Sequence, residues 1–300
     1  MQILIFIKVK ELENLPYVTF QVDKNSLNEL KDDKLKSLFD GNYLILKKVH
    51  SWFQSNVAKF CSYCEKTSKF KDLGILKVEK SESGPACTLK LCTSSHVTKG
   101  NVGTSQFEHI SVDLVPVFLI DVDHLTRYTY SNIHDLSEVD GQYCHMVPKP
   151  LKKELNFLTP STASKAWRVS FPVQEKHTFA DKEPLKIVMK LMKMLRDHEN
   201  WKMPSYFCKA AAFWLVNKHP LSSYWSDSDL GDLFLECLDD FHKHLTLNHL
   251  GHIIYPNFNL LHTLTPNTIE QIRKRIQNIQ GKLQRNPAYA YSLFKSYQLL

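Results

Sequence analysis

One stretch decides how this chain folds: Ala166-Trp167-Arg168-Val169-Ser170-Phe171-Pro172-Val173-Gln174-Glu175-Lys176. Arg168, Ser170 and Glu175 place charges and a hydroxyl among residues that otherwise have the composition of a buried strand. Burying an unpaired guanidinium or carboxylate is costly, so these groups need either an internal salt bridge or a ligand. The internal bridge is the commoner arrangement in proteins, and the rest of the sequence has to decide between the two.

Size and composition predict a folded globular protein with an anionic partner. The chain has 300 residues, of which 43% are apolar, which is enough for one large or two ordinary domains. Its formal net charge of +7 favours nucleic acid, nucleotide or an acidic surface as a partner, although lysines on solvated faces give the same balance. Seven scattered cysteines without a secretory signal ahead of them predict free thiols in a reducing compartment, the cytoplasm.

The two halves of the chain differ in their apolar pattern. The first half has short apolar bursts typical of strands, at 1–10, 17–22, 73–92 and 109–120, and a helix predicted over about 43–61 with Asp40 or Asn42 as its cap. From Pro184 onward, apolar residues recur every three or four positions, which is typical of packed helices. We therefore expect an α+β fold with a mixed-sheet lobe, 1–175, followed by a helical-bundle lobe, 176–300. The opening strand is too short to cross a membrane, and no membrane partner is expected. Because chains seldom start inside a core strand, we expect the native protein to begin upstream of Met1.

Several polar residues are candidates for chemistry, and each has a simpler structural interpretation. Asp113 is a lone carboxylate in an apolar strand, where a strand-end hydrogen-bond acceptor is commoner than a metal ligand. Ser205 follows a proline and suits an ordinary helix N-cap, but a helix start also binds anions and Tyr206 offers a stacking face. Cys61-x-x-Cys64 has no second Cys/His pair at zinc-finger distance, so no structural zinc is expected. No phosphate-loop, Rossmann or α/β-hydrolase motif is present.

Taken in order, these segments resemble one known family. They are Gly84-Pro85-Ala86-Cys87-Thr88-Leu89, Ser111-Val112-Asp113-Leu114, His145-Met146-Val147-Pro148-Lys149, Trp167-Arg168-Val169-Ser170-Phe171, Leu191-Met192-Lys193, Ser205-Tyr206, Trp225 with Asp229-Leu230-Gly231, and Tyr255-Pro256-Asn257-Phe258-Asn259-Leu260. Together they look like the Mab-21 family, and most like its cyclic GMP-AMP synthase-like receptors. The similarity covers nearly the whole chain, and the ordered set is far more specific than any single motif.

The resemblance implies a two-lobed nucleotidyltransferase that joins ATP and GTP into a cyclic dinucleotide. Such enzymes use Mg²⁺ or Mn²⁺ held by three carboxylates. By the family pattern, Asp113 would be the third catalytic and metal-binding carboxylate. The nucleotide-binding set would follow in chain order: Arg168 and Ser170 at a nucleobase, Glu175 beside the nucleotide, Lys193 and Ser205 at the triphosphate, and Tyr206 stacked on a base.

The chain departs from the family pattern in two places. The Gly-Ser pair and the Glu-x-Asp with the first two carboxylates belong just before the strand that Met1 begins, so we expect an incomplete sequence, with a natural pseudoenzyme as the alternative. The loop 176–184 has only His177 where the vertebrate DNA sensor carries a zinc module of one histidine and three cysteines. The chain thus looks more like the invertebrate receptors, for which double-stranded RNA is a better expectation than double-stranded DNA.

A basic surface is predicted along the helix of the first half, with Lys66 in the segment that follows the helix. Lys47, Lys48, Lys59 and Lys66 would follow a phosphate backbone in a salt-sensitive way, and two copies would assemble on the nucleic acid. The sequence thus leaves two functions open: an RNA-activated cyclic dinucleotide synthase, and a catalytically inactive Mab-21-like protein that binds nucleotide or nucleic acid.

Overall fold

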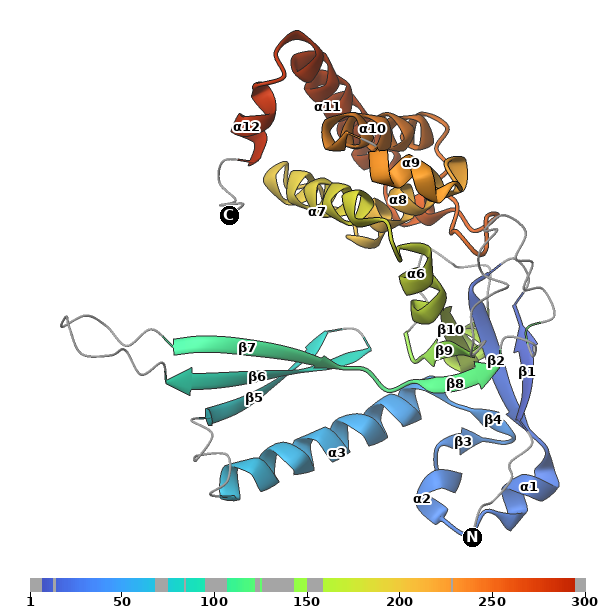
Figure 1. The fold of residues 1–300 in the computed structure, drawn as a ribbon. Helices are drawn as coiled ribbons and strands as arrows, with labels where there is room; N and C mark the ends of the chain where they lie inside the picture. Colours follow the sequence, from blue (N-terminus) through green and yellow to red (C-terminus); the bar gives the residue numbers. More distant parts are fainter. Residues whose placement is uncertain are drawn as a thin grey trace. The chain divides into compact units, whose positions relative to one another are not determined.

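The chain folds into two compact units, which we describe separately. The computed structural model describes residues 7–12, 15–67, 75–83, 85–94, 107–121, 125, 143–149, 159–227 and 229–294. The first unit consists mainly of Pro16–Leu125 and Tyr143–Ser170, and the second mainly of Phe171–Leu300. The first is drawn in blue to green and the second in yellow to red in Figure 1.

A seven-stranded antiparallel sheet forms the centre of the first unit. Its order is β3-β4-β2-β10-β9-β8, and β1 pairs with β2 outside this path. The strands are β1 (Ile7–Glu11), β2 (Tyr17–Val22), β3 (Phe39–Asp40), β4 (Tyr43–Leu44), β8 (Phe118–Asp121), β9 (Tyr143–Val147) and β10 (Ala166–Ser170). Short helices α1 (Lys24–Glu29), α2 (Asp33–Lys36) and α5 (Pro160–Lys165) belong to the same unit. Strand β10 lies between β2 and β9, and Arg168 at its middle is paired on both sides, with Tyr17 and Val147.

The apolar face of β10 packs into an aromatic core. Trp167 is fully buried, its indole N–H donates to the carbonyl of Leu44 at 3.3 Å, and its ring makes edge contacts with Phe20 and Phe118. A buried indole needs such a partner because its N–H is a donor that water can no longer satisfy. This packing fixes the orientation of β10, so the side chains of Arg168 and Ser170 are directed to the other face.

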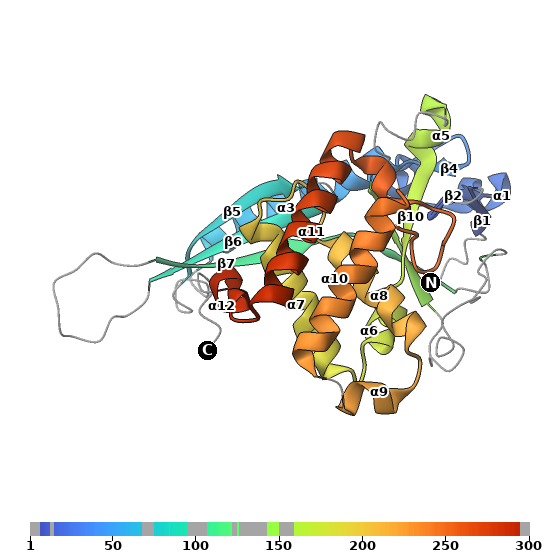
Figure 2. The ribbon, with the colours of Figure 1, turned by 90° about the horizontal axis from the view of Figure 1, so that it is seen from above.

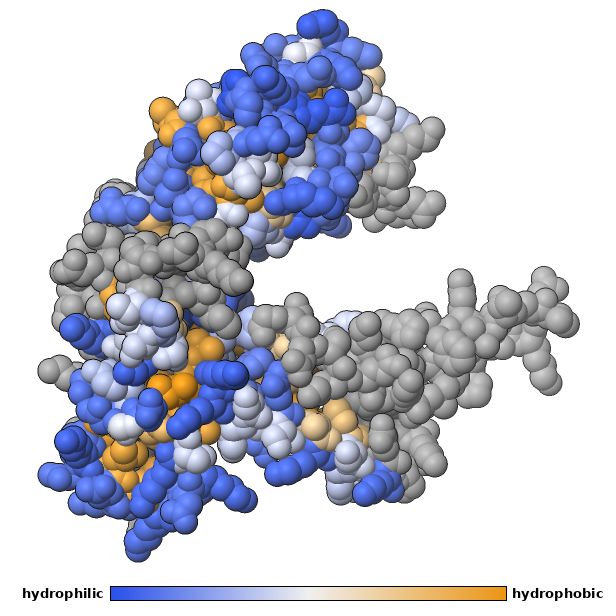
Figure 3. Space-filling model, turned by 180° about the vertical axis from the view of Figure 1, so that it is seen from behind, coloured by the Kyte–Doolittle hydropathy of each residue, from blue (hydrophilic) through white to orange (hydrophobic). Residues whose placement is uncertain are grey.

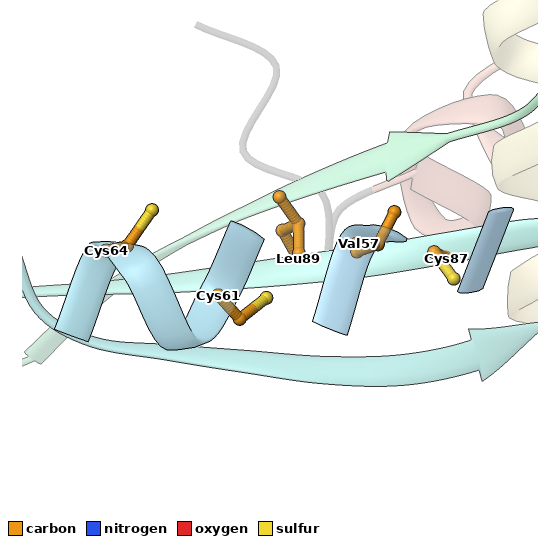
Figure 4. Packing of buried hydrophobic residues seen from close by; sticks show 5 residues of the cluster. All are labelled: Val57, Cys61, Cys64, Cys87 and Leu89. Carbon is orange, nitrogen blue, oxygen red and sulfur yellow. The ribbon is translucent and has the colours of Figure 1, made fainter. Parts of the chain in front are cut away.

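The second sheet of this unit is three-stranded and antiparallel. It consists of β5 (Ile75–Ser83), β6 (Ala86–Ser94) and β7 (Phe107–Leu114), and helix α3 (Leu46–Lys66) lies along it in Figure 1. The contact is a small apolar cluster of Val57, Cys61 and Cys64 from the helix with Cys87 and Leu89 from β6 (Figure 4). Described strand pairs in both sheets are all antiparallel, whereas the sequence analysis expected a mixed sheet.

Helix α3 differs from its predicted form at both ends. It starts at Leu46 after an uncapped Ile45, and the residues expected to cap or begin it form the short hairpin β3–β4 instead. Its buried stripe continues through Cys61 and Cys64, while Phe60 is 46% exposed. The six described cysteines are all free and buried, in agreement with the prediction of free thiols.

The second unit is a bundle of helices. Its elements are α6 (Pro172–Thr178), α7 (Glu183–His198), α8 (Tyr206–Lys218), α9 (Ser222–Asp227), α10 (Leu230–Thr246), the 3-10 turn η3 (Leu260–Thr263), α11 (Pro266–Arg285) and α12 (Tyr289–Phe294). Helix α8 is buried on nearly all sides, and α7, α10 and α11 each bury one stripe (Figure 2). Thr265 caps α11 by accepting the N–H of Thr268, ahead of Pro266 at the first helical position. Figure 3 shows hydrophilic side chains over most of the described surface of this bundle, as amphipathic helices require.

The α+β class predicted from the sequence is confirmed, with an antiparallel sheet unit followed by a helical unit. No helix in the described residues is long and apolar enough to cross a lipid bilayer.

Candidate functional site

Asp113 lies on β7, directly opposite Thr88 on β6. The hydroxyl of Thr88 donates to Asp113 Oδ1 at 2.6 Å, and the carboxylate is exposed, whereas the neighbouring Leu114 packs on the α3 cluster. Within the described residues, no group of three or more His, Cys, Asp or Glu side chains is arranged to hold a metal ion. A carboxylate oxygen suits a hard divalent cation, but one carboxylate without neighbours does not make a metal site. Asp113 could therefore supply one oxygen ligand to such a cation but could not hold it alone.

Arg168 and Ser170 share a face of β10 with polar residues of the adjoining strands. Arg168 pairs in register with Tyr17 on β2, and Ser170 with His145 on β9. Directly opposite residues of antiparallel strands present their side chains to the same face, so these four line a polar strip across the centre of the sheet. Arg168 and Ser170 are each half-buried. The structure thus adds Tyr17 and His145 to the predicted pair.

The environment of this polar strip shifts the pKa of two of its members. Burial raises the pKa of Tyr17, and the nearby charge of Arg168 opposes that rise. Burial lowers the pKa of His145, which favours the neutral imidazole. At neutral pH the strip therefore presents a cation at Arg168 beside neutral donors and acceptors, which suits recognition of a polar, uncharged ring system.

Glu175 has an internal partner, which the sequence analysis weighed as the commoner interpretation. In α6 its Oε2 accepts from Lys209 Nζ of α8 at 2.5 Å, and its Oε1 accepts from the hydroxyl of Tyr206 at 3.1 Å. The side chains of Glu175 and Lys209 are 13% and 27% exposed. Lys209 was not among the predicted residues, although its position three residues after Tyr206 places both on one face of α8.

His252 completes this network and fixes the direction of its hydrogen bonds. Its Nδ1 accepts the backbone N–H groups of Ile254 and Tyr255, at 3.2 and 3.4 Å. An imidazole nitrogen that accepts carries no hydrogen, so we infer that Nε2 carries it and donates to the Tyr206 oxygen, 3.1 Å away. The hydroxyl of Tyr206 then donates its hydrogen toward Glu175. The sequence analysis missed His252, because its role depends on a loop conformation that no local pattern signals.

Tyr206 is held in place by these contacts. Its ring lies at 27° to that of His252 with centroids 5.8 Å apart, and His252 is only 3% exposed. The predicted stacking of Tyr206 on a base stays a prediction, but a half-buried phenol fixed at its hydroxyl has the rigidity that such a role requires.

Lys193 and Ser205 lie on the facing helices α7 and α8 of the same unit. Lys193 is half-buried. Burial raises the pKa of the Cys208 thiol to about 11, and the positive charge of nearby Lys193 opposes that rise. Ser205 is exposed at the start of α8, but its side chain makes no capping hydrogen bond. Ser205 is thus the N-cap residue of α8, as the sequence predicted, but its hydroxyl does not cap the helix.

The predicted basic surface lies on α3 in the first unit. Lys47, Lys48, Lys59 and Lys66 are all exposed, and Lys48 Nζ donates to the carbonyl of Phe39 at 2.5 Å. In the described part of the chain, none of the four forms an ion pair. Four unpaired cations on one helix give it an electrostatic preference for anions.

The architecture is thus an antiparallel sheet unit with a polar strip across its centre, followed in the sequence by a unit of packed helices. The model of the Mab-21 protein nucleotidyltransferase domain matches residues 3–181, and that of the Mab-21 protein HhH/H2TH-like domain matches residues 184–278. The chain belongs to the Mab-21 family.

Insect proteins named "Cyclic GMP-AMP synthase-like receptor" are similar to most of the chain. The protein from Aethina tumida is 29% identical over 259 residues, covering 84% of this chain and 59% of the relative. Those from Nicrophorus vespilloides and Trichogramma pretiosum are 25% and 27% identical, covering 89% and 81% of this chain and 67% and 47% of the relatives. The chain thus spans about half to two thirds of the length of the curated relatives it matches. The resemblance stated from the sequence is confirmed.

Proposed function

We propose that this chain is the nucleotidyltransferase part of a cyclic GMP-AMP synthase-like receptor, which joins ATP and GTP into a cyclic dinucleotide when double-stranded RNA binds. The observation that supports this most is the polar strip on β10, which lies inside the matched nucleotidyltransferase domain. In this proposal Arg168 and Ser170 contact a nucleobase, and Glu175, Lys193, Ser205 and Tyr206 serve the nucleotide from the helical unit. The buried free thiols support the cytoplasm as the compartment, and two copies would share one duplex.

Divalent metals are general to nucleotidyltransferases, and we propose Mg²⁺ or Mn²⁺ here with Asp113 as one ligand. The ion would neutralise phosphate charge when bound, whereas the residues above bind and orient the nucleotides. Asp113→Asn keeps the acceptor for Thr88 and removes the charge, so it should abolish metal-dependent activity without unfolding the sheet.

The alternative is a catalytically inactive Mab-21 protein that binds nucleotide or nucleic acid. It is favoured by the isolation of Asp113, which has no carboxylate companions in the described residues. A protein of this kind would keep the polar strip and the basic helix and lose turnover.

One experiment separates these functions. The full-length protein, expressed from its complete transcript, is incubated with ATP, GTP, Mg²⁺ and a 40-base-pair RNA duplex, and products are analysed by mass spectrometry while nucleotide binding is followed by thermal shift. A cyclic dinucleotide that disappears in Asp113→Asn and persists in Asp232→Asn, an exposed carboxylate in α10, supports the synthase. A thermal shift without product supports the inactive binder.

Matched variants test the binding residues. Arg168→Ala and Lys193→Ala should each reduce the nucleotide-dependent shift, and Lys190→Ala, an exposed lysine on the same helix as Lys193, should not. A parent chain that gives neither product nor nucleotide-dependent shift would contradict both functions.

A further inference from the structure

One face of α3 carries a regular series of exposed lysines and aromatic rings. Lys48, Trp52, Ser55, Lys59, Tyr63 and Lys66 follow one another at steps of four, three, four, four and three residues, which is the spacing of a single helix face. All six are exposed. We call this set the lysine–aromatic stripe.

The aromatic rings of the stripe are unusually open to solvent. Trp52 is 42% and Tyr63 is 63% exposed, whereas the opposite side of the helix buries Val57, Cys61 and Cys64 against β6. Isolated exposed apolar residues need no explanation. Two large rings that alternate with lysines along one line are a different arrangement: Trp52 has Lys48 one turn before it and Lys59 two turns after it, and Tyr63 lies one turn from both Lys59 and Lys66.

The lysines of the stripe also differ from several lysines on other helices of this protein. Lys186, Lys243 and Lys274 each pair with an acidic residue three or four positions away on their own helix. In α3 the only acidic residue is Glu65, and Lys48, Lys59 and Lys66 make no ion pair with any described residue. A solvated helix face usually intersperses both signs, so a face with cations alone is complementary to an anion.

We propose that the lysine–aromatic stripe binds a single-stranded stretch of nucleic acid, with unpaired bases stacked on Trp52 and Tyr63 and phosphates held by the lysines. Duplex bases are stacked on one another and offer no free face, whereas unpaired bases stack on aromatic side chains whatever their identity. Eleven residues separate Trp52 from Tyr63, so the rings lie about 16 Å apart along the helix, with Lys59 between them. This inference rests on the proposed nucleic-acid partner and adds which form of it the helix prefers.

Fluorescence anisotropy of labelled 20-nucleotide RNA tests the proposal, with a blunt 20-base-pair RNA duplex as the comparison probe. Replacing both rings (Trp52→Ala with Tyr63→Ala) should weaken single-strand binding by roughly five- to a hundred-fold for each base that loses its ring, and leave duplex binding within about twofold. Lys59→Ala should weaken both probes and lower the slope of log affinity against log salt by about 0.7 to 0.9. Lys34→Ala is the matched control, because Lys34 is an exposed lysine of the same unit that lies in α2, outside the predicted basic surface.

A second variant guards against loss of folding. Trp52→Phe keeps a stacking face and should retain single-strand affinity within about threefold, and circular dichroism should show every variant folded. The proposal is overturned if the parent does not bind the single strand, if the double variant binds it as the parent does, or if both probes weaken equally. The proposal is also overturned if light scattering shows that the parent is a dimer and the double variant a monomer, while both bind RNA equally. The stripe would then join two copies of the chain.

The outcome is independent of catalysis. A chain without nucleotide turnover can still show ring-dependent binding of single strands, and an active synthase can lack it. Failure of the proposed function and failure of this inference therefore give different results.

Discussion

Replacing Lys209 by methionine should loosen the contact between α6 and α8. The substitution keeps most of the length of the side chain and removes the ammonium that neutralises Glu175, leaving the carboxylate with the hydroxyl of Tyr206. Glu175 is only 13% exposed, so water replaces the lost partner incompletely. The prediction follows from leaving a half-buried charge without its counterion.

The magnitude lies between two known limits. Breaking a fully buried pair costs about 3 to 5 kcal/mol, whereas an exposed pair contributes at most about 1 kcal/mol. With side chains 27% and 13% exposed, the pair of Lys209 and Glu175 is intermediate, and we expect a loss of about 2 kcal/mol. That loss corresponds to a roughly 30-fold increase in the population of the locally open state.

Hydrogen exchange of backbone amides, followed by mass spectrometry on peptides from α6 and α8, measures this population directly. Lys243→Met is the matched control, because Lys243 is 59% exposed and pairs with Asp239 on its own helix, so exchange should change by no more than about twofold. Adding Glu175→Gln to Lys209→Met removes the stranded charge and should restore part of the protection. Exchange in Lys209→Met within twofold of the parent, or strictly additive effects of the two substitutions, would refute the reasoning.

Three further outcomes follow from other contacts of the helical unit. Burial acts to raise the pKa of Glu236, but hydrogen bonds from neighbouring side chains outweigh burial and lower this pKa to about 2. The ionised Glu236 therefore stabilises the fold above about pH 4.5, and this stabilisation is lost toward pH 2. The difference in Tm between the parent and Glu236→Gln should shrink over that range. Arg275→Ala should lower stability to urea by about 1 to 3 kcal/mol, because the guanidinium bonds both oxygens of Glu199, which is 6% exposed. Gly251→Ala should lower the Tm sharply, since the added Cβ would lie 2.6 Å from a backbone carbonyl oxygen. Gly281→Ala lies in α11, and the nearest atom to its added Cβ would be 3.8 Å away. In the same melting experiment, this second substitution should raise stability by about 0.5 to 1 kcal/mol.

The helices could be predicted from the sequence more completely than the sheet. Periodic apolar residues predicted α7, α8, α10 and α11, because each helix buries its own stripe and the signal is local. The position of β10 between β2 and β9 could not be predicted, because strand pairing depends on contacts between distant residues. Trp167, for example, donates to a carbonyl 123 positions earlier in the chain. The sequence predicted the start of a helix at Tyr43, where β4 instead pairs with Gln21 of β2, which is another contact between distant residues.

The candidate residues were predicted by family order, and their partners were not. Nothing local to Glu175 indicates Lys209, because a salt bridge between two helices is set by their packing. The neutral tautomer of His252 depends on two backbone N–H groups that only the folded loop brings to Nδ1. Sequence patterns thus identify which side chains carry chemistry, and tertiary structure decides which of them are already satisfied.

The polar residues between Ala166 and Lys176 have two kinds of environment, an internal ion pair and a polar face of the sheet. Glu175 lies in the helical unit and has an internal ion pair, so its substitution breaks a network whether or not a nucleotide binds. Arg168 and Ser170 lie on strand β10, and Trp167 packs on the opposite face of this strand and donates a hydrogen bond there. The face that carries Arg168 and Ser170 also carries Tyr17 and His145. Loss of nucleotide binding in Glu175 variants would therefore have a structural explanation as well as a functional one. The same loss at Ser170, where a hydroxyl is removed from a half-buried strand position and the core is untouched, would indicate contact with the ligand.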